Sequence, residues 1–128
     1  MRYLAHVREL PSLDHMTDEE KQQVDKRFDA NDFELNFDGN AVEWGLIDEM
    51  EIVPAARQNT PAGWLVKNLL FRGERYHIGV YFGREEMILT NITEEIARFI
   101  AQTIAYYARQ EVRYKGVEDV APLADEGT

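Results

Sequence analysis

The chain has 128 residues and a formal net charge of −10, with 45% hydrophobic and 30% charged residues. This composition is typical of a single globular domain and is too apolar for a disordered chain. No apolar run approaches the ~20 residues of a membrane-spanning helix, and the acidic balance argues against nucleic-acid binding, which needs a basic surface. The chain has no cysteine. Because residues 1–6 also lack the apolar stretch of a secretory signal, we expect a cytoplasmic protein.

The first predicted helix begins near Thr17. The run from Thr17 to Glu20 fits a capping box, in which a threonine and the glutamate three residues later bind each other's backbone N–H groups. Only Val24 and Phe28 form an apolar stripe on this helix. We therefore expect a surface helix and an N-terminal arm over residues 1–31. This arm is predicted to be peripheral, so that a fragment of residues 32–112 folds without it.

Two short strands are predicted next. Apolar and polar residues alternate over 33–37, and the alternation resumes at 42–44 after the turn sequence Asp38-Gly39-Asn40. A third strand is predicted over 47–53, before Pro54. These patterns predict an antiparallel sheet in which Phe33 shares the buried face with the other apolar residues of its strand.

A basic hairpin is the most distinctive feature of the sequence. Residues 57–84 contain five Lys/Arg and one acid, in a chain that is acidic overall. Strands over 64–71 and 75–82, joined by a three-residue loop, place most apolar residues on one face. Pairing in this register puts Lys67 opposite Gly79 and Leu69 opposite His77. The other face is mixed, and it holds the candidate binding residues Lys67, Leu69, Phe71, Arg75, His77 and Tyr81.

A second helix is predicted near the C-terminus, after a short strand over 87–89. Asn91 is the predicted N-cap residue. Apolar residues recur at helical spacing from Ile96 to Tyr107, which predicts a continuous buried stripe. The helix is expected to end between residues 109 and 112, and residues 124–128 are expected to be a disordered tail.

This order of elements, antiparallel strands followed by an amphipathic helix, resembles the pleckstrin-homology-like superfold. The resemblance covers about residues 33–108 and implies an α+β domain over 32–123. In it, about six strands form an antiparallel, strongly bent, barrel-like sheet that the C-terminal helix closes. Lipid-binding members of that family carry basic residues around the first hairpin loop. Here the loop is Asp38-Gly39-Asn40, so the resemblance does not imply a lipid ligand.

No catalytic pattern is present in the sequence. His6, His15 and His77 do not share a helix turn or a strand face at the spacing of metal ligands. No glycine-rich phosphate loop or nucleophile elbow occurs. We therefore expect a protein that is not an enzyme and has neither a metal nor a cofactor.

Two functions fit the mixed face of the basic hairpin. The first is a contact with a protein partner or with a second copy in a homodimer, because apolar, aromatic and arginine residues are favoured in such interfaces. The second, with or without an enzymatic activity, is a pocket for a small molecule or anion, formed if Lys67 and His77 converge above Gly79 beside Tyr81. A third interpretation assigns no binding function: Lys67 and Arg75 extend from a covered face and pair with acids of the N-terminal arm.

Overall fold

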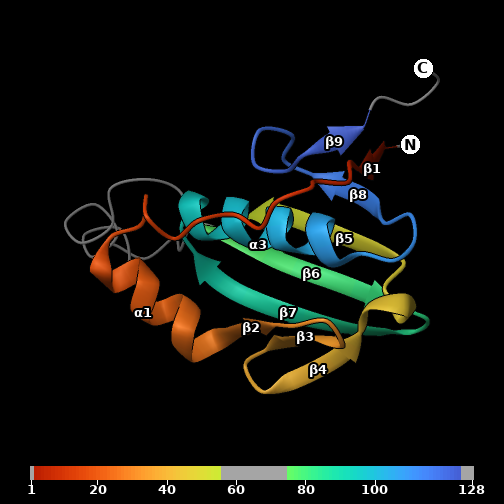
Figure 1. The fold of residues 1–128 in the computed structure, drawn as a ribbon, viewed down its shortest axis with the longest axis horizontal. Helices are drawn as coiled ribbons and strands as arrows, with labels where there is room; N and C mark the ends of the chain where they lie inside the picture. The colour runs from red at the N-terminus through yellow and green to blue at the C-terminus, as the bar shows by residue number, and fades with distance from the viewer. Residues whose placement is uncertain (1, 56–74, 125–128) are drawn as a thin grey trace.

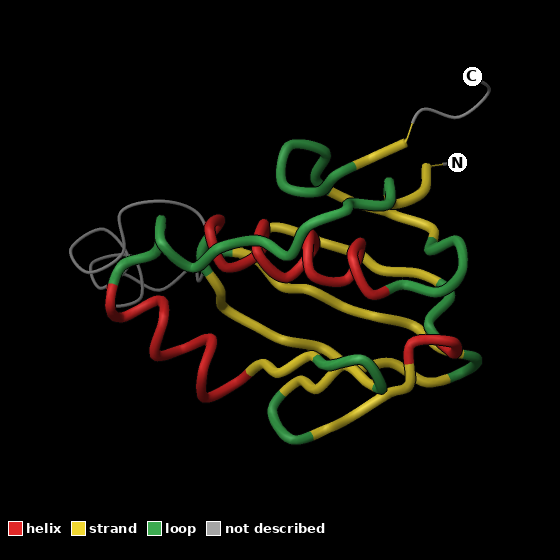
Figure 2. The backbone as a smooth tube through the Cα atoms, in the orientation of Figure 1, coloured by secondary structure: helices red, strands yellow, loops and turns green. Residues whose placement is uncertain are grey.

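A computed structural model describes residues 2–55 and 75–124 and shows an α+β fold with two open sheets and two helices (Figures 1 and 2). The strands are β1 (Arg2–Leu4), β2 (Phe28–Ala30), β3 (Glu34–Phe37), β4 (Asn40–Glu43), β5 (Glu49–Pro54), β6 (Tyr76–Phe82), β7 (Glu85–Ile92), β8 (Arg113–Gly116) and β9 (Leu123–Ala124). The two α-helices are α1 (Asp18–Arg27) and α3 (Glu94–Tyr107), and Trp44–Leu46 form the short 3₁₀ helix η1. Neither α1 nor α3 is long and apolar enough to cross a membrane.

The main sheet has six strands in the order β7-β6-β5-β8-β1-β9, and the small sheet has the order β2-β3-β4. All described pairs are antiparallel except β5 with β8. The prediction of one barrel-like sheet was wrong in this respect: the described strands form two open sheets and no closed barrel. The predicted C-terminal helix is also not the last element, since β8 and β9 follow α3 and extend the main sheet.

Helix α3 lies across the main sheet, while the small sheet lies beside β7, and α3 provides much of the core (Figure 1). Most of its predicted stripe is buried, and Ile100 and Ile104 have no exposed surface. The ring of Phe28 in β2 meets Phe99 edge-on at 5.9 Å, and Trp44 of η1 stacks on Tyr107 at 5.2 Å. These aromatic contacts join α3 to the small sheet and to the 3₁₀ helix that follows it.

The start of α3 differs from the prediction. Thr93 is the N-cap residue, and its hydroxyl accepts a hydrogen bond from the backbone N–H of Ile96 at 3.3 Å. Asn91 instead belongs to β7, with a positive φ of 58°. Because asparagine tolerates this left-handed conformation better than most residues, Asn91 can occupy an irregular position in β7 where the register to β6 shifts.

The N-terminal segment contributes more than a peripheral arm. Strand β1 lies between β8 and β9, and β2 pairs with β3. Met16, Val24 and Phe28 are buried in the core. The predicted boundary between residues 31 and 32 falls in the turn of the β2–β3 hairpin. Between β1 and α1, residues 5–16 form a strap that runs along α3 (Figures 1 and 2).

Phe33 also departs from its predicted place. Its side chain is 80% exposed, whereas Leu35 and Phe37 are buried as expected. The cause is the turn before β3, where the side-chain oxygen of Asn31 accepts hydrogen bonds from the backbone N–H groups of Phe33 and Glu34. This Asx turn holds Phe33 outside the strand.

The carboxylate of Glu20 connects the starts of both helices. It accepts the capping-box hydrogen bond from the backbone N–H of Thr17 at 3.0 Å, as the sequence predicted, and a second one from the hydroxyl of Thr93. Burial acts to raise the pKa of Glu20, but the hydrogen bonds from Thr93 and Thr17 and the positive charge of Arg75 outweigh it, so the pKa lies below the usual 4.5. The ionised form is therefore the one that stabilises the fold.

Replacing Glu20 with glutamine should lower the free energy of unfolding by about 1 kcal/mol near neutral pH, the usual contribution of a cap. Since the folded pKa is depressed, the contribution of Glu20 is present above the unfolded value and is lost as pH falls through the folded value. Urea unfolding near neutral pH and in the acid range should show the gap between variant and wild type closing on acidification. Glu19→Gln, in the same helical turn but exposed, is the control. An equal effect of both substitutions would contradict the role given to Glu20.

Candidate functional site

The face of the main sheet that points away from α3 is only partly buried in the described structure. On the opposite face, which packs against α3, residues such as Ile52, Ile78 and Val80 have no exposed surface. We call the face that points away from α3 the open face. It is made of these residues, all half-buried or exposed except the glycine: Glu49, Glu51, Val53, His77, Gly79, Tyr81, Glu86, Ile88, Arg113 and Lys115.

Charges on the open face are ordered across the strands. Basic Arg113 and Lys115 lie on β8, and the carboxylate of Glu49 on β5 is 3.5 Å from each of them. At the other side of the face, Glu86 lies near the start of β7, an edge strand of the main sheet, while the neighbouring Glu85 belongs to the opposite face. The face is thus basic on the β8 side and acidic at Glu86 on the β7 side, where Ile88 on the same strand is 47% exposed.

Tyr81 lies across Gly79 and fills the space above it. A Cβ atom at Gly79 would be 3.2 Å from the Tyr81 hydroxyl oxygen. This hydroxyl donates a hydrogen bond to Glu51 at 2.9 Å. The bond, together with burial and the negative charges of Glu51, Glu86 and Glu49, raises the pKa of Tyr81 to about 12. The room that the sequence predicted above Gly79 is therefore occupied, and its surroundings are acidic.

His77 has one ring nitrogen fixed by the backbone. Its Nδ1 accepts a hydrogen bond from the N–H of Asn91 at 3.0 Å. An accepting Nδ1 carries no proton, so the neutral ring has its proton on Nε2 and offers a donor there. His77 in this state suits recognition of an acceptor better than it suits removal of a proton or binding of a metal.

Strand β6 pairs differently from the prediction. Glu51 lies opposite Gly79 and Val53 lies opposite His77, while β7 occupies the other edge of β6. The partners predicted for these two residues were therefore wrong, because β6 pairs with β5 rather than within a 64–82 hairpin. The predicted candidates Lys67, Leu69 and Phe71 lie outside the described residues.

Arg75 precedes β6 and interacts with α1. Its positive charge lowers the pKa of Glu20, and Glu20 in turn acts against the burial that lowers the pKa of Arg75. This supports the interpretation in which Arg75 pairs with an acid of the N-terminal segment. Of the predicted residues, the structure thus places His77 and Tyr81 on the open face and Arg75 close to Glu20.

Sequence reasoning missed several members of the open face. The alternation of Glu86, Ile88 and Thr90 along β7 was a usable signal, since these residues are exposed and Met87 and Leu89 between them are buried. Lys115 gave no such signal, because β8 has only four residues.

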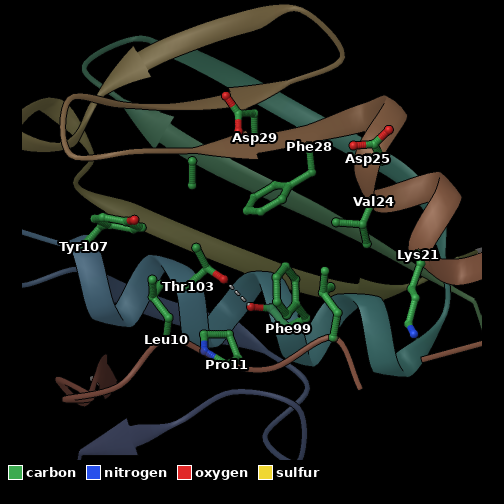
Figure 3. Close-up of a pocket in the computed structure, with 12 residues that line it drawn as sticks. Leu10, Pro11, Lys21, Val24, Asp25, Phe28, Asp29, Phe99, Thr103 and Tyr107 are labelled. Carbon is green, nitrogen blue, oxygen red and sulfur yellow. Dashed lines mark hydrogen bonds between the residues drawn. The ribbon is translucent and has the colours of Figure 1, made fainter. Parts of the chain in front are cut away.

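A groove of about 270 Å³ lies on the opposite side of the molecule, against α3 (Figure 3). Residues 10–13 of the strap form one wall, and residues 21–30 of α1 and β2 form the other. Phe99, Thr103 and Tyr107 of α3 line its floor. We call it the α3 groove.

The floor of the α3 groove has little free polarity. The Thr103 hydroxyl donates to the backbone oxygen of Phe99 at 2.8 Å and is satisfied within the helix. Burial and the negative charges of Asp32 and Asp29 raise the pKa of Tyr107, and no described residue hydrogen-bonds to its hydroxyl. The floor of the groove is therefore mainly apolar, and its charged lining residues, Lys21, Asp25 and Asp29, belong to the wall formed by α1 and β2.

Comparison with known proteins identified no relative of this chain. The chain matches no protein-family model, no curated protein and no solved structure. Within residues 2–55 and 75–124, no three histidine or acidic side chains are grouped so that they could hold a metal ion.

Proposed function

We propose that this protein is a non-catalytic interaction module that associates with a second copy through the open face. The observation that carries the proposal is Ile88, which is 47% exposed on β7 opposite Gly79, on a sheet face that holds Glu86 on the same strand and basic residues on β8. Apolar and tyrosine side chains surrounded by charged residues are characteristic of protein interfaces.

Charge order supports a twofold-symmetric arrangement. In such a dimer the same patch of each copy meets the other copy in reverse orientation. The basic β8 side of one molecule would then lie against the acidic β7 side of its partner, twice. This arrangement requires no second surface and is self-limiting.

The geometry favours this function over an anion pocket at His77 and Tyr81. The Tyr81 hydroxyl already donates to the carboxylate of Glu51. An anion placed there would be repelled by Glu51 and by Glu86. A polar acceptor from a protein partner, reached by the Nε2–H of His77, fits these surroundings better.

The test is sedimentation equilibrium over a range of concentrations, with wild type expected to dimerise. Ile88→Lys should weaken association by about tenfold or more, because transferring Ile88 from water contributes about 1.5–3 kcal/mol and a lysine on the β7 side would face the basic β8 side of the second copy. Leu46→Lys is the control, since Leu46 is 54% exposed but lies in η1, off the open face. A strictly monomeric wild type, or equal weakening by both variants, would exclude the proposal.

Charge reversal tests the orientation separately. Lys115→Glu and Glu86→Lys should each weaken the dimer and make it more sensitive to salt, since each creates like-charge contacts. The double variant restores opposite charges in reversed positions and should recover most of the association. Failure of the double variant to recover would mean that β7 and β8 do not face each other.

A further inference from the structure

Phe33 is held in solvent by a turn whose backbone is fixed from outside as well as from within. We call residues 31–34 the Phe33 turn. The indole N–H of Trp44 donates to the backbone oxygen of Asn31 at 2.7 Å, and Arg109 donates to that of the residue before Phe33 at 2.8 Å. Together with the Asx turn, these bonds fix the position of a phenylalanine that is 80% exposed. A preorganised, exposed aromatic side chain is suited to be the anchor of a protein contact.

The Phe33 turn lies at the Tyr107 end of the α3 groove. Ala30, the last residue of β2, lines the groove and directly precedes the turn. Arg109, which binds the turn, follows Tyr107 by two residues. The exposed phenylalanine and the groove are therefore neighbours on one molecule.

The α3 groove has the size and the lining that a phenyl ring needs (Figure 3). Its volume of about 270 Å³ exceeds the ~150 Å³ cavity known to hold benzene. The floor offers Phe99 and a Thr103 hydroxyl that is already satisfied. On the strap wall, Leu10 and Leu13 are 50% and 37% exposed, so apolar surface there is incompletely covered. Residues 6–12 make no backbone–backbone hydrogen bond within the described chain, so this wall can adjust to a ring.

We propose that Phe33 of one molecule inserts into the α3 groove of a second copy. Because the phenylalanine and the groove are neighbours, two copies related by a twofold axis can exchange phenylalanines and close as a pair. The contact involves no residue of the open face and goes beyond the association proposed there. A single anchor per groove makes a small interface, and we expect a dissociation constant of roughly 0.1–1 mM.

The experiment uses the full chain carrying Ile88→Lys, so that the result does not depend on the open-face contact. NMR spectra recorded from about 0.05 to 2 mM, a range that spans the expected dissociation constant, should show concentration-dependent shifts in the strap, α3 and the Phe33 turn. Adding Phe33→Ser should weaken this association by about tenfold or more, as loss of an anchor residue does. Leu46→Ser is the control, because Leu46 is 54% exposed and does not line the groove. Groove signals that are independent of concentration, or equal weakening by both variants, would overturn the proposal.

Mixing two variants tests whether the phenylalanine of one molecule meets the groove of another. In the Ile88→Lys chain, Phe33→Ser keeps the groove, and Leu10→Asp alters the groove but keeps Phe33. Both positions are at least half exposed, so both variants should fold as the parent does. Each variant alone should associate weakly, and an equimolar mixture should recover part of the lost association. Absence of recovery in the mixture would contradict the insertion of Phe33 into the groove of a second copy.

Discussion

Replacing Gly116 with alanine is expected to lower the free energy of unfolding by about 4 kcal/mol or more, at the severe end of single substitutions. Gly116 has a φ of +107°, and a Cβ atom there would lie 1.9 Å from the backbone oxygen of Ile52. Two heavy atoms cannot approach this closely, and neither backbone can move without breaking the β5–β8 ladder. This parallel pair connects β7-β6-β5 to β8-β1-β9, so its loss divides the main sheet.

Two other glycines separate the causes of this effect. Gly39 also has a positive φ, +88°, but nothing lies within 4 Å of a Cβ there; Gly39→Ala should show backbone strain alone, about 1–2 kcal/mol. Gly45 has open space around it and no positive φ, and Gly45→Ala should stay within about 0.5 kcal/mol. Thermal unfolding should rank Gly116 well above Gly39 and Gly39 above Gly45. Equal effects at Gly116 and Gly39 would mean that β5 and β8 are not in close contact.

Local signals in the sequence predicted local structure well. The capping box at Thr17 forms as expected, and the apolar spacing from Ile96 to Tyr107 identified α3 and its buried side. The alternation in residues 76–82 sorted Ile78 and Val80 inward. These predictions depend on neighbours within one helical turn or one strand, where a residue's own chemistry decides the outcome.

Pairing between distant strands was not predictable in the same way. Strands β1, β8 and β9 have three, four and two residues, which is too short for periodicity to be recognised. Strand β1 also pairs with partners more than 100 residues away along the chain. The sequence favoured pairing within a 64–82 hairpin because neighbouring segments close the smallest loop.

In the candidate site, too, local patterns were predictable from the sequence and the pairing of distant strands was not. Alternation along β6 placed His77 and Tyr81 on one face, as the structure has them. Their interactions could not be predicted, because Glu51 and Asn91 reach them only through the actual register of β5 and β7. A register shift of one residue exchanges the two faces of a strand, so the acidic surroundings of Tyr81 follow from tertiary pairing.

Removing residues 1–31 is expected to abolish cooperative unfolding, contrary to the prediction from the thin apolar stripe of α1. The deletion removes β1 from between β8 and β9, β2 from the small sheet, and the buried side chains of Met16, Val24 and Phe28. Burial of three such side chains contributes about 5–9 kcal/mol, comparable with the entire stability of a typical domain, about 5–15 kcal/mol. Circular dichroism during thermal and urea unfolding, with NMR signal dispersion, measures the loss.

Two phenylalanines provide the matched controls in the full-length chain. Phe28 is buried and packs against both Phe37 and Phe99, so Phe28→Ala should cost about 3–5 kcal/mol. Phe33, five residues away and 80% exposed, should change stability by no more than about 0.5 kcal/mol when replaced by alanine. A truncated chain that unfolds cooperatively at the wild-type midpoint would show that the core is complete without the first 31 residues. Equal effects of the two substitutions would remove Phe28 as the reason that the N-terminal segment is needed.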